Sequence, residues 1–192
     1  MDKYRLTKQG LWDILEGWEP FLPGKVRLVA CGGTALTLQD LKESTKDVDF
    51  LVPDEDEYKA VLSTIKKLNY RQVTGSGWAR DGGFVFDLFP GKIVFKTELL
   101  DSPLDEGRYI PIRTFKKLLV GALNDHDLII SKMFRGTDVD VDDCLRLING
   151  RGKDFDLAKL KDRYKETAKY DIRPEEMMKN LDLLLAELEE RK

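Results

Sequence analysis

Two short motifs near the start of the chain contain the residue types that can bind a nucleotide and its metal ions. Residues 31–36 read Cys-Gly-Gly-Thr-Ala-Leu and close one apolar run, and the next apolar run begins with Asp47 and Asp49, which are separated by one residue. Magnesium takes oxygen ligands and keeps several waters, so two protein carboxylates with substrate phosphates form a usual ligand set. The two motifs together predict a site for a triphosphate and its metal ions.

The glycine pair is expected at a junction between a strand and a helix. Residues 26–31 are apolar and rich in β-formers, which predicts a buried strand. The residues after Gly33 follow helical spacing, so Gly32 and Gly33 lie where the first N–H groups of a helix have no partner. Such a junction can bind phosphate, glycine permits close approach of a ligand, and the Thr34 hydroxyl can donate to a phosphate oxygen.

The two aspartates are expected on one face of a second strand. Residues 47–52 alternate, so Asp47 and Asp49 point to one side while Val48 and Phe50 point to the other. The two carboxylates can therefore converge on a cation. A third carboxylate would complete a site for two metal ions.

The third candidate is Asp87, which interrupts an apolar and aromatic run over residues 83–89. A buried carboxylate without a partner is costly, so such groups are normally paired or bound to a metal ion. A cation shared with Asp47 and Asp49 is one such partner. The alternative, which stays open, is that Asp87 faces solvent from an edge strand or pairs with a basic side chain.

These residues resemble the signature of the minimal nucleotidyltransferase superfamily, which has a Gly-Gly or Gly-Ser turn, an Asp-x-Asp on the next strand and a third acid on a later strand. The chain is most similar to the abortive-infection toxin-type branch, through residues 32–36, 45–49 and 86–88. A weaker similarity extends through residues 127–133 to Asp140 and Asp143, and the whole covers residues 25–150. The first two motifs are specific in combination because the expected strand and helix context accompanies them.

The resemblance implies an α+β fold with a mixed β-sheet palm like that of DNA polymerase beta, flanking helices and a C-terminal helical region. It implies in-line attack by a hydroxyl on the α-phosphorus of an NTP, with pyrophosphate leaving and Mg²⁺ or Mn²⁺ as cofactor. The implied metal ligands and catalytic residues are Asp47, Asp49 and Asp87, the last also as a candidate base.

The same resemblance implies that Gly32, Gly33 and Thr34 hold the triphosphate, and that Lys132 reaches its charge from a later helix. Lys46 can steer phosphate, although a lysine beside two aspartates can also serve only to balance their charge. The implied acceptor is RNA, which is tRNA in the toxin-type branch, or protein, and the implied partner is a cognate antitoxin. Two alternatives stay open: a catalytically silent nucleotide-binding or regulatory module, and a protein that binds a partner through its C-terminal leucines.

Composition sets the outer limits. The 192 residues are 42% hydrophobic and 35% charged, enough for one core or a core with a helical appendage. The net charge of −3 argues against indiscriminate nucleic-acid binding. No apolar run approaches the roughly 20 residues that span a membrane, and no apolar signal segment follows residues 1–5, so we expect a cytoplasmic protein without a membrane partner. Two cysteines and one histidine argue against zinc and disulfide frameworks.

We expect a core over residues 1–114 and a helical region over 115–192. Expected helices cover residues 7–18, 54–68, 155–170 and 174–191, and expected strands cover 71–73, 84–89, 93–99 and 109–112. The pattern turns helical from about Phe115. Leu181, Leu184, Leu185 and Leu188 form a stripe that we expect to face the core.

Two further features predict ordinary roles. His126 lies among helix-start residues, which favours a capping-region or surface role over that of a general base. Residues 138–143 have the spacing that opens a calcium loop, but Asp143 stands where the loop needs glycine and Asn149 where it needs glutamate. An acidic helix N-terminus is therefore expected there.

Overall fold

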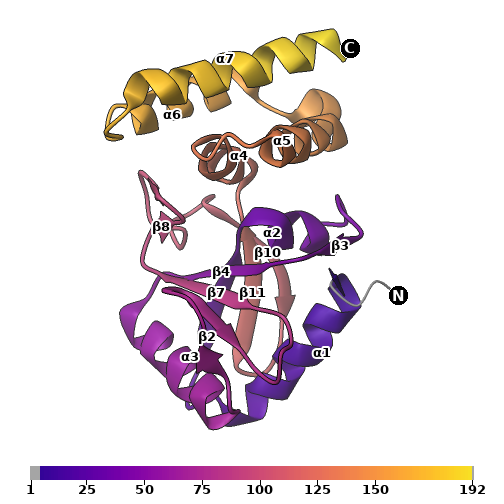
Figure 1. Cartoon of the computed structure of the whole chain (residues 1–192), viewed down its shortest axis with the longest axis vertical. Helices are drawn as coiled ribbons and strands as arrows, with labels where there is room; N and C mark the ends of the chain where they lie inside the picture. The colour runs from indigo at the N-terminus through magenta and orange to yellow at the C-terminus, as the bar shows by residue number, and fades with distance from the viewer. Residues whose placement is uncertain (1–4, 192) are drawn as a thin grey trace.

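The computed structural model describes residues 5–191, in which a mixed seven-stranded sheet lies against a layer made of helices α4–α7 (Figure 1). Residues 1–4 lie outside the described range, and they make up most of the N-terminal segment, residues 1–5, behind which no apolar signal segment was expected. Within that range no helix is both long and apolar enough to cross a membrane. The expected α+β class with a mixed sheet is confirmed.

The elements follow one another as a sheet-forming part and then a helical part. They are β1 (Leu6–Thr7), α1 (Lys8–Trp18), η1 (Glu19–Phe21), β2 (Val26–Ala30), α2 (Gly32–Leu38), β3 (Ser44–Thr45), β4 (Val48–Val52), α3 (Glu55–Lys67), β5 (Arg71–Gln72), β6 (Gly77–Ala79), β7 (Phe86–Pro90), β8 (Ile93–Val94), β9 (Thr97–Glu98), β10 (Tyr109–Thr114), β11 (Leu118–Leu123), α4 (Asp125–Met133), α5 (Asp138–Arg151), η2 (Gly152–Asp154), α6 (Leu157–Ala168) and α7 (Pro174–Glu190).

The main sheet has the strand order β10-β11-β2-β4-β7-β6-β5. Strands β2 and β4 are antiparallel, whereas β4 and β7 are parallel and place Asp49 opposite Asp87. The same register places Val48 opposite Phe86 on the other face of the sheet. Because side chains alternate along a strand, one face carries the acids and the other carries apolar groups.

The apolar face is closed by α1 and α3. The ring centre of Phe86 lies 4.8 Å from that of Trp18 and 5.8 Å from that of Tyr70. Phe86 is almost completely buried, and burial of such a side chain stabilises the fold by about 1.5–3 kcal/mol. This packing fixes β7 in the sheet and so fixes the position of Asp87, the next residue.

The expectation that helices begin near Phe115 is wrong for Leu118–Leu123, which forms β11. This strand pairs in parallel with β2 and antiparallel with β10, in the interior of the sheet. A short apolar run buried on both faces has no period that separates a strand from a helix. The helices of this part of the chain begin at Asp125, after β11.

The single strand expected over residues 93–99 is also wrong. Strands β8 and β9 form a separate small hairpin whose two-residue turn is Phe95 and Lys96. Strand β6 was not foreseen, because its three residues are too short to show alternation.

The helical layer packs on α4, most of which is buried. The Tyr164 hydroxyl of α6 donates a hydrogen bond to the Met177 carbonyl of α7 at 2.8 Å. Leu181, Leu184 and Leu188 are buried in α7, and Leu185 is partly buried against the core, so the predicted core role of the leucine stripe is confirmed. The stripe therefore offers no exposed leucine face for a partner.

Helix starts follow their capping residues. The Asn124 side chain caps α4, and His126 lies partly buried in the first turn with Nε2 3.0 Å from the Asp156 carbonyl, as predicted for a capping region. Thr137 and Asp140 form a reciprocal capping box at the start of α5, which confirms the expected acidic helix start.

Candidate functional site

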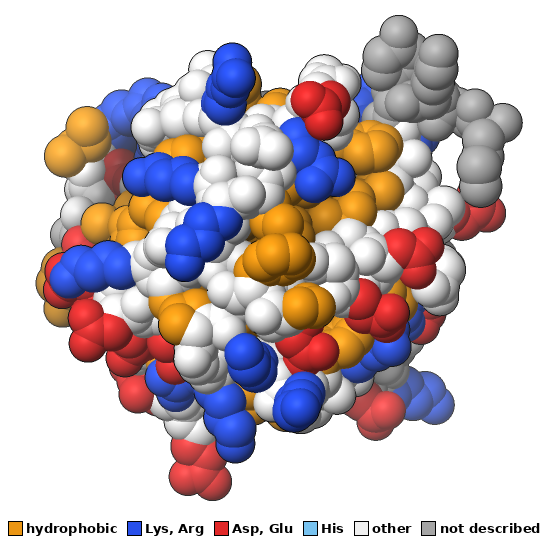
Figure 2. Space-filling view, turned by 90° about the horizontal axis from the view of Figure 1, so that it is seen from below, with side chains coloured by type: hydrophobic (Ala, Val, Ile, Leu, Met, Phe, Trp, Pro, Cys, Tyr) orange, Lys and Arg blue, Asp and Glu red, His pale blue; other side chains and the backbone are white. Residues whose placement is uncertain are grey.

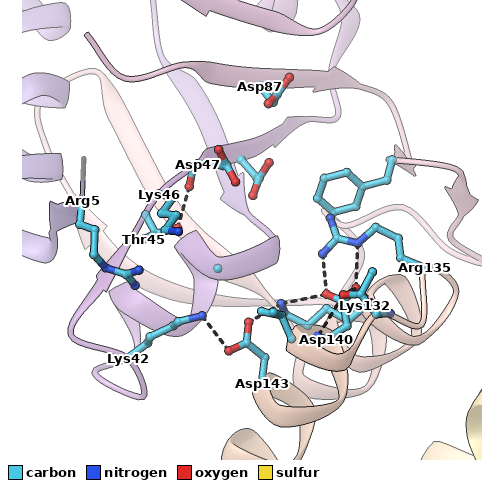
Figure 3. Close-up of a pocket in the computed structure, with 15 residues that line it drawn as sticks. Arg5, Lys42, Thr45, Lys46, Asp47, Asp87, Lys132, Arg135, Asp140 and Asp143 are labelled. Carbon is cyan, nitrogen blue, oxygen red and sulfur yellow. Dashed lines mark hydrogen bonds and ion pairs between the residues drawn. The ribbon is translucent and has the colours of Figure 1, made fainter. Parts of the chain in front are cut away.

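The three predicted acids come together in one hollow of about 530 Å³ between the sheet and the helical layer. Asp49 and Asp87 are directly paired on β4 and β7, and Asp47 immediately precedes β4. In Figure 3, Asp47 and Asp87 lie on the sheet side, and Lys132, Arg135 and their acidic partners face them from α4, α5 and the intervening loop. The predicted convergence is thus a feature of the fold.

The Asp49 carboxylate lies so close to residue 32 that this residue has to be glycine. Gly32 has φ +56°, in the left-handed region, and a Cβ atom at this residue would lie 2.4 Å from Asp49 Oδ2. The Cys31 N–H donates to the Asp49 carbonyl at 3.1 Å, which ties the turn to the strand. Of the two glycines, Gly33 lines the hollow, while Gly32 is buried and provides the space for Asp49.

The Thr34 hydroxyl positions the acidic strand. Its side chain is fully buried, and Oγ1 donates to the Asp47 carbonyl at 3.1 Å and accepts from the Asp49 N–H at 3.0 Å. The Thr45 hydroxyl donates to the same Asp47 carbonyl at 2.8 Å. The Thr34 hydroxyl therefore already donates its hydrogen to a backbone carbonyl. Thr34 is also not one of the residues that line the hollow.

Asp49 is a buried carboxylate with an unusual electrostatic environment. It is 5% exposed, and the hydrogen bonds from residues 5–191 reach its backbone but not its carboxylate. Burial, together with the negative charges of Asp87 and Asp47, raises its pKa to about 7, and the positive charges of Arg135 and Lys132 only partly oppose this rise. A cation would relieve both the burial cost and the repulsion.

The donor chemistry of the hollow fits a hard divalent cation. Asp87 accepts a 2.6 Å hydrogen bond at Oδ1 from Ser76 Oγ, which leaves Oδ2 for another partner. No basic side chain among residues 5–191 pairs with it, and it is half-buried, so neither predicted alternative for Asp87 describes it fully. As placed, no three His, Cys, Asp or Glu side chains of the described chain form a preformed metal cluster. Magnesium sites commonly complete their ligands with water and substrate phosphates.

Lys132 is held inside a network of charges. It is 2% exposed, and its Nζ lies 2.8 Å from Asp143 Oδ2 and 3.5 Å from Asp140 Oδ1. Lys42 Nζ lies 2.8 Å from Asp143 Oδ1, and Arg135 lies 2.6 Å from Asp140 Oδ1. Lys132 lines the hollow, but its charge is already matched by two aspartates, so its contact with the triphosphate stays a prediction.

The pKa of Asp143 is lowered by its cationic neighbours in this network. Burial pushes the pKa of its carboxyl upward, but the charges and hydrogen bonds of Lys132 and Lys42 outweigh burial and lower it. A buried charge is tolerated only when it is paired in this way. The network joins α2 and its following loop to α4 and α5, so it fixes the helical wall of the hollow.

Lys46 is a cation at the rim of the hollow. It lines the hollow, it is exposed, and it makes no ion pair with another of residues 5–191. Arg5 also lines the hollow, but its guanidinium donates to the Ser44 hydroxyl at 2.7 Å and to the Ser44 carbonyl at 2.8 Å. Lys46 therefore has a charge that no acid among residues 5–191 neutralises and that is available for an anionic ligand.

The sequence interpretation missed Lys42 and Arg135, and it gave Asp140 and Asp143 no part in the hollow beyond following the core. Lys132 and Arg135 are three residues apart, as are Asp140 and Asp143. Residues three apart share one face of a helix, so two cations and two acids at this spacing were a usable signal for paired charges. Nothing local indicated Lys42, which lies 101 residues before Asp143.

Phe95 is a strained residue at the edge of the hollow. Its φ of +54° puts a bulky side chain at the first central position of the β8–β9 turn, where glycine is usual. Left-handed backbone costs a residue other than glycine about 1–2 kcal/mol. The Arg135 guanidinium lies over the Phe95 ring, 3.8 Å from its centre, and this cation–π contact offsets part of that strain.

Comparisons with known proteins identify the family of the chain and proteins of similar fold. The profile of a family described as "Nucleotidyltransferase of unknown function (DUF6036)" matches residues 22–192. Among solved structures, the chain is similar to ANT(2″)-Ia in complex with adenylyl-2″-tobramycin, with TM-score 0.57 and 12% identity over 85% of this chain and 98% of that chain. Another is an antigenic nucleotidyltransferase-like protein from Paracoccidioides brasiliensis, with TM-score 0.47, 12% identity and coverage of 91% and 94%. No curated protein sequence matches this chain.

Proposed function

This chain belongs to DUF6036, a family of nucleotidyltransferases of unknown function, and we propose that it transfers an NMP group from an NTP to an acceptor hydroxyl in the hollow lined by Asp47, Asp49 and Asp87. The observation that carries the proposal is the pairing of Asp49 with Asp87 on adjacent strands, with Asp47 beside them. Three carboxylates line one hollow, and the carboxylate of the buried Asp49 accepts no hydrogen bond from residues 5–191. This arrangement suits a site that gains a cation with its substrate.

Asp47, Asp49 and Asp87 would hold Mg²⁺ or Mn²⁺. When bound, the metal would supply charge neutralisation at the transferring phosphoryl group. Gly33 and Lys46 line the same hollow and would contact the triphosphate, Lys46 with a charge that no other residue of the described chain uses. Gly32 and Thr34 act on the triphosphate indirectly, since they hold Asp49 and Asp47 in place.

The reaction forms a bond between the acceptor oxygen and the α-phosphorus of the NTP. The bond between the α-phosphorus and the bridging oxygen breaks, and pyrophosphate leaves with the electron pair. The hydroxyl proton passes to a carboxylate, for which Asp87 is the candidate because its Oδ2 is free of the Ser76 hydrogen bond. Positioning and charge neutralisation carry most of such a reaction, so few specialised side chains are needed.

The proposal includes the finer features that the toxin-type resemblance suggests. The acceptor is an RNA, tRNA in that branch, or a protein hydroxyl, and the reaction takes place in the cytoplasm, where NTPs are available. The chain would act as the toxin of a toxin–antitoxin pair, with the antitoxin as its protein partner. A catalytically silent nucleotide-binding module is the competing function.

Transfer of label separates the two functions. Each α-labelled NTP is incubated with total RNA or protein and Mg²⁺ or Mn²⁺, using wild type and Asp47→Asn. Asp47 is exposed, so its amide variant is expected to fold normally. Label that depends on Asp47 supports the enzyme and identifies its nucleotide and acceptor class. Absence of transfer with retained NTP binding favours the silent module.

A further inference from the structure

A second hollow, which we call the aromatic pocket, opens on the other side of Asp87. It has a volume of about 490 Å³, and its walls include Phe89, Phe95, Phe134, Lys96 and Arg173. Asp87, Phe95 and Arg135 line both hollows, whereas Asp47, Asp49 and Gly33 line only the first. The Arg135 guanidinium lies 3.8 Å from the centre of the Phe95 ring, so these two side chains together separate the two hollows. Asp87, the candidate base, borders both hollows.

We propose that the aromatic pocket receives the 3′ end of a single-stranded RNA, whose terminal hydroxyl is the acceptor of the transfer. This inference rests on the proposed function and names the substrate class of the same site. It chooses RNA over protein as the acceptor. It also assigns Lys96 and Arg173 to acceptor binding.

The direction of attack places the acceptor on this side. In an in-line displacement, the attacking oxygen and the leaving pyrophosphate lie on opposite sides of the α-phosphorus. The triphosphate side is the first hollow, which holds Gly33, Lys46 and the acidic pair. The attacking hydroxyl must then arrive from beyond Asp87, and the aromatic pocket is the hollow found there.

The lining of the pocket suits a nucleotide. Three phenylalanine rings offer planar apolar surface, and the Phe89 and Phe95 rings meet edge to face at 5.2 Å. Lys96 makes no ion pair with another residue of the described chain, and Arg173 is paired 3.0 Å from Glu176. Aromatic side chains beside a cationic rim are the usual means of holding single-stranded nucleic acid, by stacking on bases and neutralising phosphates.

Backbone strain supports a role for the β8–β9 turn. Phe95 keeps a left-handed φ of +54° in a turn where glycine would be relaxed, and its neighbour Lys96 is exposed at the same tip. Residues held in such conformations gather at binding and catalytic sites. The turn presents Phe95 to both hollows and Lys96 to the aromatic pocket.

The surface continues beyond one nucleotide. A third hollow of about 300 Å³ shares Phe134, Lys96 and Arg173 with the aromatic pocket and adds Tyr170 and Ile172, which are 74% and 92% exposed. Its two acids already have partners, Glu98 in an ion pair with Lys92 at 3.2 Å and Asp171 as the acceptor of the Arg173 N–H at 2.8 Å. An exposed tyrosine ring next to cations offers a stacking position for a second base. This continuity favours a polynucleotide end over a free nucleotide. Figure 2 shows the end of the molecule away from the helical layer, where Lys and Arg side chains lie among acidic and hydrophobic ones.

The test uses the whole protein and a labelled twelve-nucleotide RNA without secondary structure. Lys96→Glu, Arg173→Glu and Tyr170→Ala change exposed side chains, so the fold is expected to survive. The control is Lys67→Glu, the same charge reversal at an exposed residue of α3 that lines neither hollow. RNA binding is followed by fluorescence anisotropy, and NTP binding is measured separately on each variant.

We expect Lys96→Glu and Arg173→Glu each to weaken RNA binding by tenfold or more and to reduce the salt dependence of binding by about one phosphate contact, with NTP affinity unchanged. Tyr170→Ala is expected to weaken binding of the twelve-nucleotide RNA but not of a single nucleotide. Lys67→Glu is expected to match wild type. Equal binding by wild type and both charge reversals, or an equal loss in Lys67→Glu, would overturn the proposal.

The same measurements separate this proposal from the function on which it rests. Pocket-dependent RNA binding without any transfer supports the aromatic pocket and contradicts the enzyme. Label transferred to protein, unaffected by Lys96→Glu and Arg173→Glu, supports the enzyme and overturns the RNA acceptor. Transfer to RNA 3′ ends that is lost in both charge reversals, at unchanged NTP affinity, supports both.

Discussion

Gly32 and Asp49 lie so close together that a Cβ atom on residue 32 would come within 2.4 Å of Asp49 Oδ2. The glycine of the turn and the acid of the next strand are therefore one structural unit. The turn motif and the acidic motif have to occur together because the first makes room for the second.

Gly32→Ala tests this unit. The new methyl group would displace the Asp49 carboxylate, and the left-handed φ adds strain of about 1–2 kcal/mol. We expect nucleotide transfer to fall at least a hundredfold and the free energy of unfolding to fall by about 1–3 kcal/mol, as measured by label transfer and urea denaturation. Gly24→Ala is the control, because no atom lies within 4 Å of its Cβ position. Wild-type transfer by Gly32→Ala would show that the Asp49 position is not needed.

Thr34→Val tests how the acidic strand is positioned. Valine keeps the shape but removes the hydroxyl that bridges the Asp47 carbonyl and the Asp49 N–H. A buried donor left without a partner costs about 1–3 kcal/mol, so urea denaturation should show a loss of that size. Thr34→Ser retains the hydroxyl and should keep most of the stability and transfer. A variant Thr34→Val that loses NTP affinity while its stability stays unchanged would instead favour direct contact with phosphate.

The raised pKa of Asp49 makes stability depend on pH. Between the unfolded value of about 3.9 and the folded value of about 7, the native state keeps a proton that the unfolded state releases. Rising pH therefore favours the unfolded state across that range, and the stabilisation present at low pH is lost by about pH 7. Asp49→Asn does not titrate, so its stability relative to metal-free wild type should rise by about 2–3 kcal/mol between pH 5 and 8.

Denaturation curves of both proteins in EDTA, at several pH values, check this prediction. Parallel stability profiles would mean that Asp49 is not protonated in the native state. Addition of Mg²⁺ is expected to stabilise wild type more at pH 8 than at pH 5, and to leave Asp49→Asn largely unaffected, because the metal binds the deprotonated carboxylate.

Lys132→Met tests whether Lys132 is structural. Removing one member of a buried charge network leaves Asp143 and Asp140 short of a partner, although Lys42 and Arg135 remain. We expect a loss of about 3–5 kcal/mol in unfolding free energy. The double variant with Asp143→Leu should recover part of this loss, because it also removes the unpaired acid. Unchanged stability with a large rise in the KM for NTP would restore Lys132 to the phosphate-binding role that the sequence suggested.

The parts of the site that the sequence predicted are those encoded in short segments. Alternation placed Asp47 and Asp49 on one face of β4, and the apolar run around Asp87 gave β7. Both motifs carry their own strand context. The resemblance implied that Asp87 joins the other two acids, but the direct pairing of Asp49 with Asp87 on adjacent strands is visible only in the structure.

The parts that the sequence did not predict depend on contacts between distant segments. β11 is a central strand, so its six residues carry no alternation that marks them as a strand. Lys132 was expected to reach the triphosphate, and its pairing with Asp143 could not be foreseen because it depends on the packing of α4 against α5. The strained Phe95 turn has no glycine or asparagine to signal a hairpin, so neither the turn nor the aromatic pocket could be foreseen.

The most direct test of the central claim compares α-labelled with γ-labelled NTP, using wild type and Asp49→Asn with Mg²⁺ and the RNA acceptor. The account predicts that label from the α-position enters RNA, that label from the γ-position is released as pyrophosphate, and that Asp49→Asn abolishes both while remaining folded. Label entering RNA from the γ-position, or equal transfer by Asp49→Asn, would contradict nucleotidyl transfer at this site.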